Sequence, residues 1–138
     1  MDLAAEKRES LNKLSYRVLG LAVAVHRELG PGLMESVYEE AFSYELGQAG
    51  FQFQRQIELP LLYKGIQLSS GYRIDLLVEG ILILELKSVA ELLPLHHAQL
   101  LTYLRLARQP LGLLINFNVP RLKDGIYRIV QGNLFRNA

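Results

Sequence analysis

Residues 72–87 read YRIDLLVEGILILELK, two apolar runs joined by Glu79-Gly80. Apolar runs of this length are typical of β-strands, and the Glu-Gly pair is typical of a tight turn between them. The stretch therefore predicts a buried β-hairpin. It also contains three charged residues, Asp75, Glu85 and Lys87. Charged side chains are rarely buried without a partner, a metal ion or a function, because their desolvation costs several kcal/mol.

The three charged side chains are expected to meet at one end of the hairpin. Side chains alternate between the faces of a strand, so Glu85 and Lys87 share a face, with Cβ atoms roughly 6–7 Å apart. The turn returns the chain antiparallel and brings Asp75 near Glu85. Adjacent carboxylates repel and raise a pKa unless a cation separates them, and Mg²⁺ favours one or two carboxylates with water and phosphate oxygens. An ordinary surface pair of Glu85 and Lys87 is the alternative, but the apolar residues at 81–84 favour a buried site.

The rest of the chain predicts helices on either side of a mixed sheet. Helices are expected at 9–29, 34–48 and 94–108, and strands at 51–62, 66–68, 111–117 and 125–130. The run at 111–117 is apolar throughout, which is typical of a strand covered on both faces. The order is roughly ααβββαββ, an α/β or α+β arrangement. We expect one domain over 1–138, with flexible ends at 1–8 and 133–138.

Composition excludes several classes of site. The 138 residues include no cysteine, which excludes disulfides, thiolate zinc sites and cysteine nucleophiles. No signal-peptide pattern and no membrane-spanning run is found, so we expect a cytoplasmic protein without a membrane partner. Residues 1–104 contain nine Lys/Arg and thirteen Asp/Glu (net −4), whereas 105–138 contain six basic residues and Asp124 (net +5). The basic C-terminal quarter fits either a phosphate backbone or an ordinary solvated surface.

Three motifs resemble those of one nuclease superfamily. Asp75, nine further residues and then Glu85-Leu86-Lys87 are similar to the PD-(D/E)xK pattern, with Ile74 where that pattern has proline. Residues 99–103, QLLTY, resemble the Q-x-x-x-Y element of the RecB-like members. Residues 32–38, GLMESVY, resemble the signature of the GxxExxY family within that superfamily. The resemblance covers about residues 10 to 132.

The resemblance implies a restriction-endonuclease-like fold and a metal-dependent nuclease that hydrolyses phosphodiester bonds. It implies Mg²⁺ or Mn²⁺ as cofactor and a nucleic-acid partner, with DNA favoured over RNA. Small members of the superfamily commonly act as dimers, so a homodimer is compatible with it. The residues that it assigns to metal binding are Asp75, Glu85, the backbone carbonyl of Leu86, and Glu35. The residues that it assigns to catalysis or orientation are Lys87, Gln99 and Tyr103.

Several of these residues also have a structural interpretation. Glu35 lies in the first turn of its helix, where a carboxylate is stabilised without a metal. Tyr38 fits the core with a satisfied hydroxyl group, and Gln99 and Tyr103 fit a hydrogen-bonded pair on one helix face. His26 competes with Glu35 as a metal ligand, although a lone histidine on an apolar face is more often a core residue.

The two remaining histidines and the function of the whole chain are considered last. The adjacent residues His96 and His97 lie on different helix faces and are expected to be non-catalytic. As a whole, the chain is either a nuclease or a non-catalytic module that keeps the nuclease fold and binds nucleic acid or protein. The intact Lys87 favours the nuclease.

Overall fold

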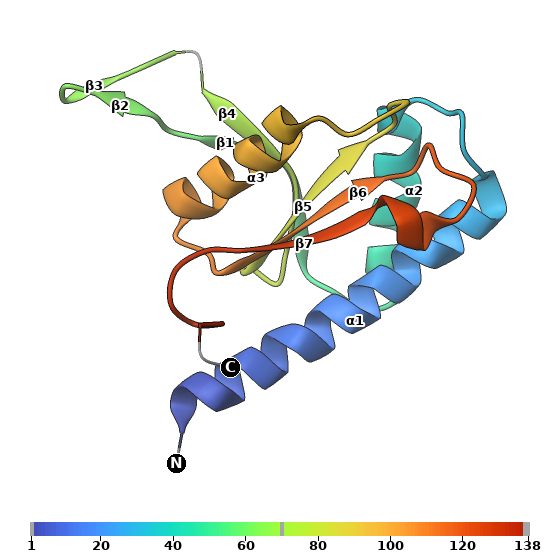
Figure 1. Cartoon of the computed structure of the whole chain (residues 1–138), viewed down its shortest axis with the longest axis horizontal. Coiled ribbons are helices and arrows are strands. Elements are labelled where there is room, and N and C mark those ends of the chain that lie inside the picture. The colour runs from blue at the N-terminus through green and yellow to red at the C-terminus, as the bar shows by residue number, and fades with distance from the viewer. Residues whose placement is uncertain (1, 70, 137–138) are drawn as a thin grey trace.

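The computed structural model describes residues 2–69 and 71–136 (Figure 1). The helices are α1 (Leu3–Leu29), α2 (Glu35–Gln48) and α3 (Pro94–Ala107), with a 3₁₀ turn η1 (Leu122–Gly125). The strands are β1 (Phe53–Leu59), β2 (Leu62–Tyr63), β3 (Ile66–Gln67), β4 (Tyr72–Val78), β5 (Leu82–Lys87), β6 (Leu111–Asn116) and β7 (Ile126–Val130).

Five strands form one mixed sheet in the order β1-β4-β5-β6-β7. Strands β5 and β6 are parallel and α3 connects them, whereas the other neighbours are antiparallel. With α1, α2 and α3, these five strands have the predicted order ααβββαββ. The predicted strand at 51–62 was wrong as a single element, because β1 ends at Leu59, before Pro60. Strands β2 and β3 form a separate hairpin that projects from the sheet (Figure 1).

Two apolar clusters cover the two faces of the sheet. The larger cluster joins α1 and α2 to Leu82, Leu84 and Leu86 of β5, and the smaller joins α3 to Ile83. The opposite placement of these neighbours confirms the predicted alternation along β5. Every residue of β6 is buried, as the apolar run at 111–117 predicted. Strand β5 therefore lies at the centre of the molecule, with covered faces and a neighbour on each side.

Helix α1 starts at Leu3 rather than at the predicted Glu9, so residues 3–8 are helical. The carboxylate of Asp2 accepts a hydrogen bond of 3.1 Å from the Ala5 N–H, which caps the helix. Near the other end of the chain, the carbonyl of Leu134 accepts a hydrogen bond of 3.1 Å from Arg8. None of the helices within 2–69 and 71–136 is long and apolar enough to cross a membrane.

Gly125 is the glycine that the packing requires most strictly. A Cβ atom at this position would lie 2.2 Å from the carbonyl oxygen of Asn116, a backbone atom that cannot easily shift. We expect Gly125→Ala to lower the free energy of unfolding by about 3 kcal/mol. The matched control is Gly20→Ala in α1, where nothing lies within 4 Å of an added Cβ. That control is expected to stabilise by about 0.5–1 kcal/mol.

Urea unfolding of the two variants measures both effects. A wild-type unfolding midpoint for Gly125→Ala would contradict the close approach of η1 to the end of β6.

Candidate active site

Asp75 and Glu85 lie side by side on neighbouring strands. The β4–β5 register pairs Leu76 with Leu84, which places Asp75 across from Glu85. The N–H of Asp75 donates a hydrogen bond of 3.2 Å to Oε1 of Glu85. In return, the N–H of Leu86 donates a hydrogen bond of 2.8 Å to Oδ2 of Asp75. The two carboxylates therefore lie as close together as the hairpin pattern predicted, and each is fixed by the other strand's backbone.

The pKa values of both carboxyl groups are raised. Glu85 is only 5% exposed, and burial, followed by the negative charge of Asp75, raises the pKa of Glu85 to about 8. Burial also raises the pKa of Asp75, and the carboxylate of Glu39 raises it further, against the hydrogen bond from Leu86. Lys87 lowers both pKa values but does not compensate for burial. If both carboxylates were ionised, the site would need more positive charge than Lys87 alone supplies.

Lys87 follows Glu85 by two residues on the α3 face of β5 and is half-buried. The end of the strand is held firmly. The N–H of Phe117 donates to the carbonyl of Lys87 at 2.9 Å. The side chain of Asn116 clamps Val89, donating to its carbonyl at 3.0 Å and accepting from its N–H at 3.1 Å. Within the described ranges 2–69 and 71–136, the ammonium of Lys87 forms no ion pair, so its donors remain available to a substrate.

Helix α2 contributes two glutamates, of which only Glu35 was predicted from the sequence. Glu35 is exposed in the first turn, yet its charge contributes to raising the pKa of Glu85. Glu39, one turn later, is only 8% exposed. Its Oε2 accepts from Nε and a terminal nitrogen of Arg55 at 3.1 and 3.0 Å. The signal for Glu39 was a carboxylate on the buried face of α2, beside Tyr38.

Gln56 of β1 is the second residue near the carboxylates that was not predicted from the sequence. Its side-chain amide donates to Oε1 of Glu39 and, at 3.3 Å, to Oδ1 of Asp75. The local sequence does not indicate a role for Gln56, because nothing distinguishes this exposed glutamine from its neighbours in β1. Gln56 links α2 to the carboxylate pair.

Helix α3 places Tyr103 near the carboxylates. Burial, followed by the charges of Glu85 and Asp75, raises the pKa of Tyr103 to about 12. The ring of Tyr103 also contacts the ring of Tyr72, with centroids 5.4 Å apart. Gln99 lies one turn earlier on the same helix and is half-buried. The structure thus brings Tyr103 close to Asp75 and Glu85.

The remaining candidates have structural contacts. Nε2 of His26 lies 2.8 Å from the carbonyl of Val119, which holds His26 in the core. The hydroxyl of Tyr38 donates to the carbonyl of Gly30 at 2.6 Å and accepts from the N–H of Leu33 at 3.1 Å. The two bonds fasten the turn between α1 and α2, so the hydroxyl of Tyr38 is satisfied in the core.

His96 and His97 also lie in structural positions. Nδ1 of His96 accepts from the N–H of Leu93 at 3.0 Å and caps α3. The ring of His97 packs edge-on against Tyr127, with centroids 5.0 Å apart.

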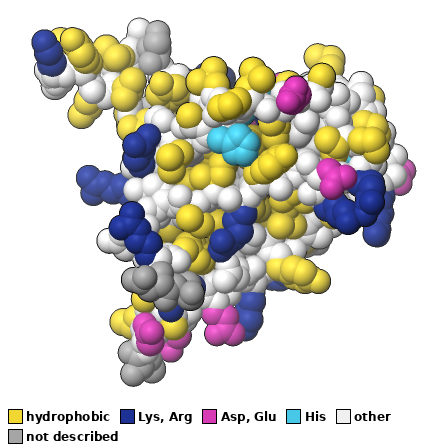
Figure 2. Space-filling view, in the orientation of Figure 1, with side chains coloured by type: hydrophobic (Ala, Val, Ile, Leu, Met, Phe, Trp, Pro, Cys, Tyr) yellow, Lys and Arg dark blue, Asp and Glu magenta, His cyan; other side chains and the backbone are white. Residues whose placement is uncertain are grey.

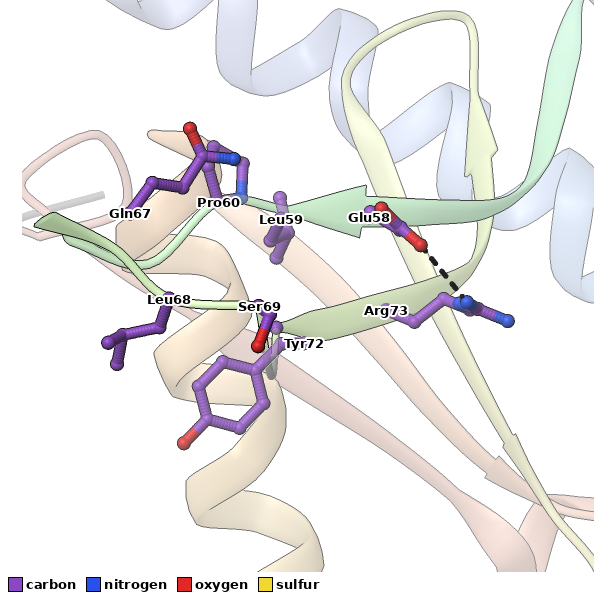
Figure 3. A pocket seen from close by; sticks show the side chains of 9 residues that line it. Glu58, Leu59, Pro60, Gln67, Leu68, Ser69, Tyr72 and Arg73 are labelled. Carbon is purple, nitrogen blue, oxygen red and sulfur yellow. Dashed lines mark hydrogen bonds and ion pairs between the residues drawn. The ribbon is translucent and has the colours of Figure 1, made fainter.

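A hollow of about 560 Å³ lies where the projecting hairpin joins the sheet (Figure 3). Its wall includes Tyr72 and Arg73 of β4, which precede Asp75 in the same strand. Arg73 pairs with Glu58 across the strands at 3.1 Å (Figure 3). The catalytic candidates themselves do not line it, so it is a neighbouring surface rather than the reaction centre.

The oxygen donors suit a hard cation. Within residues 2–69 and 71–136, no group of three or more His, Cys, Asp or Glu side chains is arranged to hold a metal ion. The available set is instead two carboxylates and a backbone carbonyl. The N–H of Leu86 points toward Asp75, and in an extended strand the carbonyl of the same residue points to the same edge. Such a sparse oxygen set fits Mg²⁺ or Mn²⁺, which keep several water ligands.

A mixed sheet whose central strand pairs antiparallel on one side and parallel on the other, between helices, is consistent with a restriction-endonuclease-like α/β fold. A family model described as the PD-(D/E)XK nuclease superfamily matches residues 12–129. The chain belongs to this superfamily, whose members are generally nucleases and typically use divalent metal ions. No curated protein and no solved structure matches the chain.

Proposed function

We propose that this protein is a Mg²⁺- or Mn²⁺-dependent nuclease of the GxxExxY branch, which hydrolyses phosphodiester bonds of DNA in preference to RNA. One observation carries the proposal: the half-buried Asp75 and the buried Glu85 lie side by side on neighbouring strands, with Lys87 on the same strand as Glu85. Burying two carboxylates together is costly unless a cation joins them. The motif with Gly32, Glu35 and Tyr38 supports the branch.

The residues that would hold the cation are Asp75, Glu85 and the carbonyl of Leu86, with Glu35 as a further ligand or its support. His26 is left out because Val119 holds it in the core. When bound, the cation would polarise the scissile phosphate and lower the pKa of a coordinated water molecule.

The protein side chains supply the remaining chemistry. Lys87 would donate hydrogen bonds to the attacking water or to the phosphate oxygen on which charge develops. Gln99 and Tyr103 would orient the nucleic-acid backbone from α3. Tyr72, which contacts Tyr103, would extend the substrate-contacting surface of α3 toward the hollow in Figure 3.

Basic side chains support a polyanionic substrate. Lys7, Arg105 and Arg108 line a hollow of about 320 Å³, and no acidic residue in the described parts of the chain (2–69 and 71–136) lines it. In Figure 2, Lys and Arg side chains follow the edge of the molecule between the projecting hairpin and the chain ends. Such an edge would attract a phosphate backbone, and its binding would weaken as salt concentration rises.

A cleavage assay tests the proposal. Single- and double-stranded DNA and RNA are each incubated with the protein in Mg²⁺, in Mn²⁺ and in EDTA. We expect cleavage of DNA that requires the metal and is lost in Asp75→Asn, a substitution that keeps the shape of the side chain but removes its charge. Cleavage that persists in EDTA or in Asp75→Asn would contradict the proposed site. Binding of nucleic acid without cleavage of any substrate would instead indicate a non-catalytic module.

A further inference from the structure

Gln56 has an unusual backbone conformation directly opposite Asp75. The β1–β4 register pairs Arg55 with Leu76 and Ile57 with Ile74, which leaves Gln56 facing Asp75. The φ angle of Gln56 is 51°, in the left-handed region that residues other than glycine rarely adopt. A strained residue retained inside a regular strand points to a role for its side chain or for the local shape.

The strands change their facing at this position. Phe53 of β1 packs against the α1–α2 cluster, whereas Ile57, four residues later, packs against the α3 cluster. In β4, Leu76 and Ile74 divide in the same way. Regular alternation would place residues separated by an even number on one face. The change of facing therefore coincides with the left-handed backbone of Gln56, opposite Asp75 and beside the carboxylate pair.

The amide of Gln56 connects two carboxylates. Both of its hydrogen bonds are donated by Nε2, one to Glu39 and one to Asp75, so the orientation of the amide is determined. Glu39 is itself fixed by two hydrogen bonds from Arg55. Asp75 is consequently held from two directions, by the Gln56 amide at Oδ1 and by the Leu86 N–H at Oδ2.

We propose that Gln56 is a positioning residue: supported by Glu39, it holds the carboxylate of Asp75 in the orientation that binds the divalent cation. The inference rests on the proposed function, in which Asp75 is a metal ligand. Partners that orient a metal ligand typically contribute 10–100-fold to metal affinity. The left-handed backbone is retained because it aims the side chain of Gln56 at Asp75 while the flanking residues stay in the sheet.

Two substitutions separate the side chain from the backbone. Gln56→Met keeps the length of the side chain but removes both donors. Gln56→Gly removes the side chain and relieves the left-handed strain. The control is Gln54→Met, at an exposed position of the same strand. Mn²⁺ affinity is measured by calorimetry and thermal stability by the unfolding midpoint, on the full chain without nucleic acid.

We expect both Gln56 variants to bind Mn²⁺ about 10-fold more weakly than wild type, with Gln56→Gly at least as heat-stable as wild type. Gln54→Met should bind normally. Wild-type affinity in both Gln56 variants would overturn the positioning role, even if their stability changes. Asp75→Asn, measured in parallel, tests the proposed function separately. If wild type and Asp75→Asn bind Mn²⁺ equally, both the metal site and the role of Gln56 are wrong.

Discussion

Replacing Lys87 by alanine is expected to slow nucleic-acid cleavage by about 10²–10⁴-fold while the protein stays folded. The ammonium lies close enough to Asp75 and Glu85 to lower both pKa values, and it forms no ion pair within residues 2–69 and 71–136. A cation in this position gains most of its interaction energy when negative charge develops on the reacting phosphate. Its loss should therefore reduce kcat far more than it weakens substrate binding.

The matched control is Lys123→Ala, which removes an exposed lysine from η1. Single-turnover cleavage of the substrate that wild type cleaves best is compared for the two variants, and circular dichroism monitors the fold. Loss of activity confined to Lys87→Ala is the expected result. If Lys87→Ala keeps more than about a tenth of the wild-type rate, or if Lys123→Ala is equally impaired, the catalytic role of Lys87 is wrong.

Glu85→Gln is expected to stabilise the metal-free protein at pH 8.5 and to abolish its stabilisation by Mg²⁺. Burial raises the pKa of Glu85 from 4.5 to about 8 in the folded protein. Between these two values the unfolded chain has released the proton and the folded chain still holds it. The free energy of unfolding therefore falls as the pH rises through this window, by a few kcal/mol in total. The glutamine variant keeps the acceptor for the Asp75 N–H without the ionisable group, so it avoids this loss.

Urea unfolding in EDTA at pH 4.5 and at pH 8.5 measures the difference. We expect the variant and wild type to be similar at the lower pH and the variant to be more stable at the higher pH. Added Mg²⁺ should then raise the stability of wild type at pH 8.5, because it binds the folded state, and leave the variant unchanged. Glu40→Gln, an exposed position on α2, is the control. A variant that is less stable than wild type at pH 8.5, or that still responds to Mg²⁺, would exclude Glu85 as a metal ligand.

Much of the fold was predictable from local patterns. The apolar run at 82–86 and the tight turn before it determine a central hairpin, and alternation along β5 places Glu85 away from Leu84 and Leu86. Strand pairing then brings Asp75 to Glu85 with no further information. The start of α1 was predicted too late, although the sequence contains a signal for it. Asp2 is a favourable N-cap residue before Ala4, Ala5 and Glu6.

The support of the site was not predictable in the same way. Glu39 and Gln56 meet only when α2 packs against the sheet beside β1, and no local rule gives that placement. The left-handed conformation of Gln56 carries no glycine or asparagine signal. The sequence thus predicted which charged residues lie close together on β4 and β5, whereas the residues that orient them depend on tertiary packing.

The parallel pairing of β5 and β6 has a consequence for the chain during its synthesis. Strand β6 begins at Leu111, after the whole of α3, so one edge of β5 is unpaired until α3 and β6 have been synthesised. An apolar strand with an open edge is a template for pairing with other chains. A charged side chain within such an edge opposes that pairing. Glu85, which is proposed to hold a metal ion in the folded protein, would thus disfavour aggregation of the incomplete chain.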